Sequence, residues 1–129
     1  MTPDTEAFLQ EAEDCLRAAI GLRDLGFPSY AAGRAYYAML NATRALLHVH
    51  GFVSHSHGEA GGILGKEFVK TGKFPPHLHK PLILGTRVRH RADYLAGDKI
   101  PIEEAEIQIQ RAIEFVRHVR GMLPHPPRD

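Results

Sequence analysis

The sequence predicts an all-α fold, an up-and-down bundle of about five helices that forms a single domain over residues 1–129. Apolar residues recur every three or four positions along most of the chain, which is the spacing of a helix with one buried face. Glycine and proline residues separate these segments, as expected where helices begin and end. A chain of 129 residues is long enough to bury one hydrophobic core.

The composition is that of an ordinary globular protein. Hydrophobic residues make up 43% of the chain, charged residues 24%, and the formal net charge is +1. This excludes the strongly basic balance of a dedicated nucleic-acid-binding protein but is compatible with a local basic patch. The single cysteine, Cys15, excludes an internal disulfide framework and fits a reducing compartment. Because no signal pattern and no run of about 18 apolar residues is present, we expect a cytoplasmic protein without membrane association.

The first two helices are expected over residues 2–26 and 29–51. Thr2 is a suitable N-cap, and Pro3 fits the first helical position. The connection at residues 27–29 is short, so the second helix should return antiparallel beside the first.

A third, shorter helix is expected from about residue 56 to 70. Ser56 and Glu59 have the spacing of a capping box. Three glycines weaken this helix by about 1 kcal/mol each relative to alanine, so it should be the least stable element; they are Gly61, Gly62 and Gly65.

The fourth helix is expected to begin between His77 and Pro81 and to end before Gly97, with the proline confined to its first turn. The fifth helix should begin at Pro101 and continue to about residue 123. Its apolar seam steps by three and four: Ile102, Ala105, Ile109, Ala112, Val116, Val119 and Leu123. Residues 124–129, with three prolines, are expected to form a frayed tail.

The second helix carries two different faces. One face is nearly all small residues, which lets a neighbouring helix approach closely; it comprises Ala31, Ala35, Ala38, Ala42, Ala45 and Val49. The other face, the polar row, comprises Tyr30, Arg34, Tyr37, Asn41, Arg44 and His48. Packing alone does not require two guanidiniums, an amide and an imidazole in one row. The polar row is therefore either a hydrogen-bonded seam against another helix or a dimer mate, or a ligand site.

Four segments resemble the HEPN domain (higher eukaryotes and prokaryotes nucleotide-binding) in its small stand-alone prokaryotic form. In chain order they are AGRAYYAMLNATRALL, SHSHG, GKEFVKTGKFP and RVRHRADY. The resemblance implies a helical bundle that forms a homodimer. It also implies a component of a toxin–antitoxin-type pair whose partner is a minimal nucleotidyltransferase. Several members of the family are metal-independent endoribonucleases.

The resemblance locates the family's ribonuclease motif in the fourth helix, where an arginine and a histidine lie about four to six residues apart and a tyrosine follows. An arginine can hold the scissile phosphate, and an imidazole can transfer a proton near neutral pH. Arg87 and Tyr94 match the arginine and the tyrosine, but Ala92 occupies the histidine position. We therefore expect binding without cleavage.

The alternative is a metal-independent endoribonuclease with a displaced histidine. The candidates for its base are His57, His90 and His48, beside Arg44 or Arg87. A helical protein-interaction adaptor is a third possibility, against which the lack of a repeat of about 34 residues argues.

The predicted function is RNA or nucleotide binding by this module. The candidate binding residues are Arg34, Tyr37, Asn41, Arg44, His48, Arg87, Arg91 and Tyr94. The arginines would contact phosphate, and the two tyrosines would stack or form hydrogen bonds. The run from Arg87 to Arg91 has an alternative as a solvated face paired with acids such as Asp93. For Tyr94 the resemblance implies a second role, as a residue that the partner can adenylylate.

No metal and no cofactor are expected. The histidine pairs at residues 55 and 57 and at residues 77 and 79 lie in turns without a cysteine or a local acid, which is a poor match to a zinc site.

Overall fold

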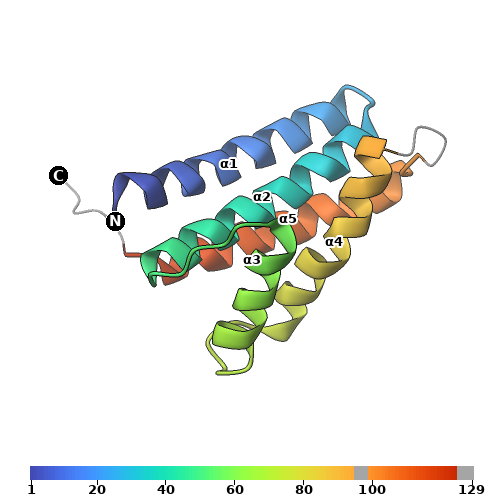
Figure 1. Ribbon diagram of the computed structural model, residues 1–129. Helices are drawn as coiled ribbons and strands as arrows, with labels where there is room; N and C mark the ends of the chain where they lie inside the picture. Colours follow the sequence, from blue (N-terminus) through green and yellow to red (C-terminus); the bar gives the residue numbers. More distant parts are fainter. Residues whose placement is uncertain (95–98, 125–129) are drawn as a thin grey trace.

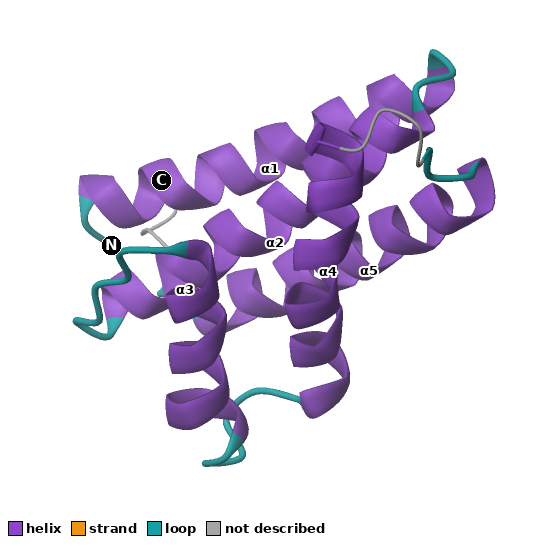
Figure 2. Ribbon diagram, turned by 45° about the vertical axis from the view of Figure 1, so that its right-hand side comes forward, coloured by secondary structure: helices purple, strands orange, loops and turns teal. Residues whose placement is uncertain are grey.

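The computed structural model describes residues 1–94 and 99–124, with the exception of the Tyr94 side chain. These residues form five α-helices and no strand: α1 (Pro3–Asp24), α2 (Pro28–Val49), α3 (His57–Leu64), α4 (Pro76–Tyr94) and α5 (Ile102–Met122). Helices α1, α2 and α5 run side by side, and α3 and α4 form a pair at a steep angle to them (Figures 1 and 2). The all-α prediction is confirmed. The predicted frayed tail lies outside the described residues, apart from Pro124.

Helix α2 is the centre of the fold, in contact with α1, α3, α4 and α5. The predicted alanine face explains how so many helices can approach it. All five alanines of that face are fully buried: Ala31, Ala35, Ala38, Ala42 and Ala45. Because alanine is small, the backbones of neighbouring helices come close. The polar row lies on the adjacent side of α2, about 100° around the helix.

The starts of α1 and α3 and the end of α2 follow the predicted signals. The backbone N–H of Thr5 donates to the Thr2 hydroxyl at 3.3 Å, and that of Glu59 donates to the Ser56 hydroxyl at 3.1 Å. The Glu59 carboxylate in turn accepts from the backbone N–H of His55 at 3.3 Å. Gly51 has a φ of +80° after α2, the left-handed conformation that glycine adopts without strain.

The predicted third helix is divided in two. After α3 the chain continues as a π-helical segment, Gly65–Val69, closed by a hydrogen bond from the Lys70 N–H to the Gly65 carbonyl at 3.0 Å. At Gly65 an added Cβ would lie 2.9 Å from the His79 ring of α4. The glycine therefore allows this turn to pack closely on α4.

The prediction that Pro81 lies in the first turn of the fourth helix was wrong. The helix begins at Pro76, because the Pro75 carbonyl accepts the N–H groups of Leu78 and His79 at 3.1 and 3.4 Å. Proline fits the first helical position, so Pro76 can begin the helix. Pro81 then lies in the second turn and leaves the His77 carbonyl without its usual intrahelical donor.

The core lies between α1, α2 and α5 and continues under α3 and α4. The predicted seam of α5 is buried except for Ile102, which is 44% exposed. A smaller cluster of Ala32, Val88, Ile100 and Ala105 joins the start of α5 to α2 and α4. No helix in the described part of the chain is long and apolar enough to cross a membrane.

Candidate functional site

The polar row lies along the partly exposed side of α2. Tyr30 is 61% exposed at its start. The Arg34 guanidinium lies 4.5 Å from the centre of the Tyr37 ring, a cation–π arrangement. Asn41 is buried, and its amide donates to the Tyr37 carbonyl at 2.9 Å. Asn41 thus satisfies a bond within its own helix, whereas Arg34 and Tyr37 present a flat cationic and aromatic surface.

His48, the last residue of the polar row, attaches α2 to the first turn of α1. Its Nδ1 lies 2.7 Å from the Thr5 hydroxyl and 3.3 Å from the Thr2 hydroxyl. Its Nε2 lies 3.9 Å from the Asp4 carboxylate. Both ring nitrogens therefore lie against the start of α1, so His48 fixes the end of α2 relative to α1.

His57, the first residue of α3, lies against two tyrosines of α2. Its ring centre is 6.1 Å from that of Tyr36 and 5.8 Å from that of Tyr37, edge-on in the second case. Burial, together with the positive charges of Arg44 and Arg89, lowers the pKa of His57 below its ordinary value. We call Arg44, His57 and Arg89 the arginine–histidine cluster. It combines two guanidiniums with an imidazole whose lowered pKa favours the neutral form.

Arg89 reaches this cluster because of the way α4 packs on α2. At Gly85 an added Cβ would lie 2.7 Å from the Tyr36 ring, so the missing side chain lets α4 approach that tyrosine. The pKa of Tyr36 is raised, mainly because the side chain is buried, and a hydrogen bond with Thr86 opposes this shift. Arg89, one turn after Gly85, shares this face of α4. Its side chain is 19% exposed and lies 3.8 Å from the Asp93 carboxylate.

Arg87 and Arg91 lie on a different side of α4, the one that faces α5. With Glu104 and Arg111 they line a shallow cavity of about 290 Å³. The Arg91 guanidinium donates to the Glu104 carboxylate at 2.9 Å. Within one chain, these two arginines are therefore not brought to the polar row.

The remaining candidates of α4 are His90 and Tyr94. His90 is exposed. The Tyr94 side chain lies outside the described residues, so its predicted role stays a prediction.

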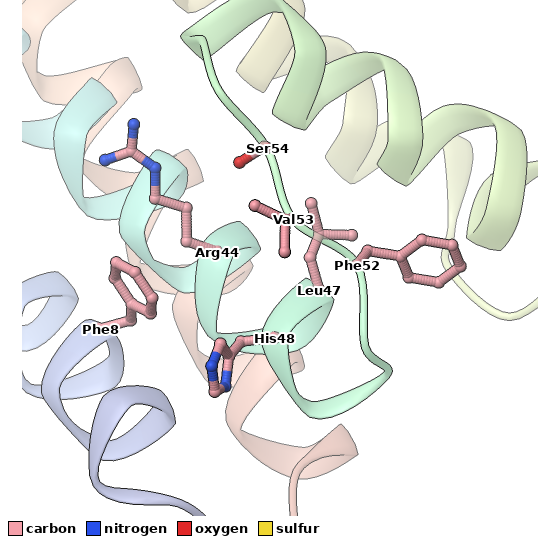
Figure 3. Close-up of a pocket in the computed structure, with 7 residues that line it drawn as sticks. All are labelled: Phe8, Arg44, Leu47, His48, Phe52, Val53 and Ser54. Atoms are coloured by element: carbon pink, nitrogen blue, oxygen red, sulfur yellow. The ribbon is translucent and has the colours of Figure 1, made fainter.

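A cavity of about 340 Å³ lies beside the cluster, between α1, α2 and the connection that leads to α3 (Figure 3). Phe8 of α1 forms one wall, and its ring centre is 6.2 Å from that of His48. Arg44 and Leu47 contribute from α2, and Val53, 65% exposed, from the connection. Arg44 therefore belongs to both the cavity and the arginine–histidine cluster.

The histidine pairs do not converge on a metal. His77 lies 3.1 Å from the Glu114 carboxylate, and the Nε2 of His79 lies 2.9 Å from the Gly61 carbonyl. Among the described residues, no group of three or more His, Cys, Asp or Glu side chains is placed to hold a metal ion.

Sequence reasoning placed Arg89 only within the basic run of residues 87–91, and it missed Tyr36 and Phe8 as members of the site. Arg89 and Tyr36 could have been found, because Arg89 follows Gly85 by one helical turn and a glycine at a helix crossing often admits a bulky ring. Phe8 could not, because its position beside Arg44 depends on the path of the connection between α2 and α3.

These features define a small all-α module with a basic, aromatic-lined site at the junction of α2, α3 and α4. The chain belongs to the HEPN-domain family, whose family model matches residues 5–123. This confirms the resemblance found in the sequence.

Three relatives are similar over nearly the whole chain. The protein named "UPF0332 protein glr0978" of Gloeobacter violaceus is 30% identical over 118 residues, which cover 91% of this chain and 94% of the relative. Two proteins of Methanocaldococcus jannaschii carry the names "Putative toxin MJ0142" and "Putative toxin MJ0605". They are 28% and 30% identical over 120 residues, which cover 93% of this chain and 82% and 89% of the relatives, respectively.

Proposed function

We propose that the protein is a toxin-like HEPN module that binds RNA or a nucleotide, with the arginine–histidine cluster as its phosphate site. The observation that carries the proposal is the contact of His57, the first residue of α3, with Tyr36 and Tyr37 of α2. The charges of Arg44 on α2 and Arg89 on α4 lie near enough to lower the pKa of its imidazole. Guanidinium groups match phosphate oxygens in geometry and charge. Aromatic rings beside them offer faces for bases.

The imidazole of His57 fits a phosphate site as well. Its pKa is lowered in the free protein by burial and by the two arginines. A bound phosphate would offset those positive charges and favour proton uptake by the ring. His57 also begins α3, and the positive end of a helix dipole favours an anion.

We further propose that the protein acts in the cytoplasm as a homodimer and pairs with a minimal nucleotidyltransferase. The names of the two archaeal relatives support a toxin-type role. Arg87 and Arg91 lie away from the cluster, so their predicted contact with phosphate belongs to a separate patch or to a site completed by the second subunit. Sedimentation that finds only monomer at micromolar concentration would contradict the dimer.

The binding proposal is tested by fluorescence anisotropy with a labelled single-stranded RNA of mixed sequence, at several salt concentrations. For single strands, each lost phosphate contact lowers the slope of log affinity against log salt by about 0.7. We expect this change for Arg44→Gln and about twice as much for the double variant with Arg89→Gln. The control is Arg117→Gln, an exposed arginine on α5 beside α1. Equal slopes for all variants would refute the phosphate site.

The endoribonuclease alternative has one observation in its favour. The lowered pKa of His57 favours the neutral imidazole, which can act as a general base for RNA cleavage near two arginines. The ring would accept the proton of a 2′-hydroxyl, whose oxygen bonds to phosphorus. The 5′ oxygen would leave and take a proton from solvent, so the products are a 2′,3′-cyclic phosphate and a 5′-hydroxyl.

A gel assay of the purified protein with mixed RNA and EDTA separates the two functions. Binding without cleavage supports the module. Cleavage that is lost in His57→Gln supports the displaced histidine. Cleavage that is lost in Arg87→Ala instead would place the active site on the side of α4 that faces α5.

A further inference from the structure

We infer that the cavity beside Arg44 is a nucleobase subsite, which receives the base of a nucleotide whose phosphate lies on the arginine–histidine cluster. This inference rests on the proposed function and adds the place where the base of the ligand binds. The geometric reason is that the Arg44 side chain, on α2, lines the cavity and also lies near His57. A ligand that joins a ring to a phosphate through one sugar fits two adjoining sites of this kind.

The walls of the cavity suit a flat aromatic ring. Phe8 and Leu47 supply apolar surface from α1 and α2, and Val53 supplies it from the connection. In Figure 3 the Phe8 ring lies on one side of the cavity, and the Val53 side chain faces it from the other. The Phe52 ring points away and packs on Phe68, with 6.1 Å between ring centres. The face for stacking is therefore that of Phe8.

Two polar groups lie at the rim, where a base needs them. They are the Arg44 guanidinium and the Ser54 hydroxyl, which lie on the same side of the cavity (Figure 3). His48 forms part of the lining, but its ring nitrogens lie against Thr5 and Asp4 of α1, so it contributes to the wall. A fixed apolar wall with a few convergent polar groups is the usual composition of a small-ligand pocket.

The size and charge of the cavity select one occupant. Its volume of about 340 Å³ lies at the lower end of the range of about 300–1,000 Å³ for ligand pockets. This suits a single base better than an oligonucleotide or a protein segment. The positive charge of Arg44, which lines the cavity, complements a phosphate attached to that base, and Arg89 adds a second positive charge near His57.

The test is calorimetric titration of the intact protein with adenosine 5′-monophosphate and with ribose 5-phosphate, which lacks the base. We expect the first to bind about 5- to 150-fold more tightly, the range of one base stacked on an aromatic side chain. Phe8→Leu keeps an apolar side chain but removes the aromatic face. It should weaken the nucleotide about fivefold or more and leave ribose 5-phosphate unchanged. Phe27→Leu is the matched control, the same change just beyond the other end of α1.

A direct measurement on the unaltered protein accompanies the variants. Magnetisation transfer in nuclear magnetic resonance should connect the base protons of the nucleotide with the Val53 methyl groups. A tetra-adenylate RNA is titrated in parallel. An effect of Phe8→Leu on both probes assigns the subsite to nucleotides in general, and an effect on the RNA alone assigns it to a base within a strand.

The possible failures can be told apart. Equal binding of the nucleotide and ribose 5-phosphate, with no transfer to Val53 and no effect of Phe8→Leu on the RNA, would overturn the base subsite and leave the phosphate site standing. Absence of binding by every probe, RNA included, would overturn both. If Phe8→Leu abolishes dimer formation in sedimentation and leaves nucleotide binding intact, the cavity belongs to a protein interface and the inference is wrong.

Discussion

At Gly85, α4 packs closely on Tyr36 of α2, and replacement of this glycine by alanine tests the packing of the site. The new Cβ would lie 2.7 Å from Cδ1 and 3.5 Å from Cε1 of Tyr36, and 3.6 Å from Cε of Met39. Real Cβ atoms do not remain at 2.7 Å from a carbon. Tyr36 is only 1% exposed, so its ring cannot move into solvent. Either the ring or α4 must shift.

Two opposing effects set the size of the change. Alanine is favoured over glycine in a helix interior by about 1 kcal/mol. Overpacking in a close-packed core typically costs about 1–3 kcal/mol. We therefore expect Gly85→Ala to lower the free energy of unfolding by up to about 2 kcal/mol. Gly21 is the matched control, because it also lies within a helix but an added Cβ there meets no atom within 4 Å. Gly21→Ala should raise the free energy of unfolding by up to about 1 kcal/mol.

The assay is urea unfolding followed by circular dichroism at the helical band, with both variants and the unaltered protein at one concentration. The difference between the two variants isolates the overpacking cost, because the helix preference enters both with the same sign. If Gly85→Ala stabilises the protein as much as Gly21→Ala does, then Tyr36 does not pack against α4 as described. The explanation of how Arg89 reaches the cluster would fail with it.

Four further predictions concern the site and its surroundings. Because the pKa of His57 is lowered from 6.5, the unfolded chain takes up this proton first. The free energy of unfolding should therefore fall as the pH drops below about 6.5, and less steeply in His57→Gln; parallel pH curves would contradict this. Phosphate affinity should rise over the same pH range in calorimetry, again through His57. Burial raises the pKa of Cys15 to about 11, so iodoacetamide at about pH 8 should label it only after unfolding; rapid native labelling would show an open α1. Ser56→Ala removes the N-cap of α3 and should lower the stability of that helix by about 1 kcal/mol. Hydrogen exchange of the α3 amides should then be faster, and unchanged exchange would mean that the cap contributes nothing.

Most of the fold could be predicted because its signals are local. The alanine face of α2 follows from spacing alone, and every alanine of it is buried. The caps at Thr2 and Ser56 follow from residue type and position. The start of α4 was harder to predict, because two prolines at residues 75 and 76 indicate a linker as readily as a helix start. Pro81 was misplaced for the same reason.

The site was predictable only in part. The polar row could be read from helical periodicity, but its neighbours depend on how α4 is rotated about its axis. Residues 87 and 89 differ by about 200° around a helix, so the choice between Arg87 and Arg89 is decided by the face that carries Gly85. The cavity depends on the course of residues 50–56, for which no periodic pattern exists. The proposed dimer and the nucleotidyltransferase partner stay predictions.

The short connection between α1 and α2 has a consequence for the order of folding. Two long antiparallel helices that are adjacent in sequence make local contacts, which close early because little chain entropy opposes them. Helices α3 and α4 contact α2 from farther along the chain. We therefore expect the α1–α2 hairpin to form first and the junction that holds His57 and Arg89 to form late. The same junction should then be the first part of the molecule to open in native-state hydrogen exchange. A ligand bound there should slow this opening more than it slows the opening of other parts of the molecule.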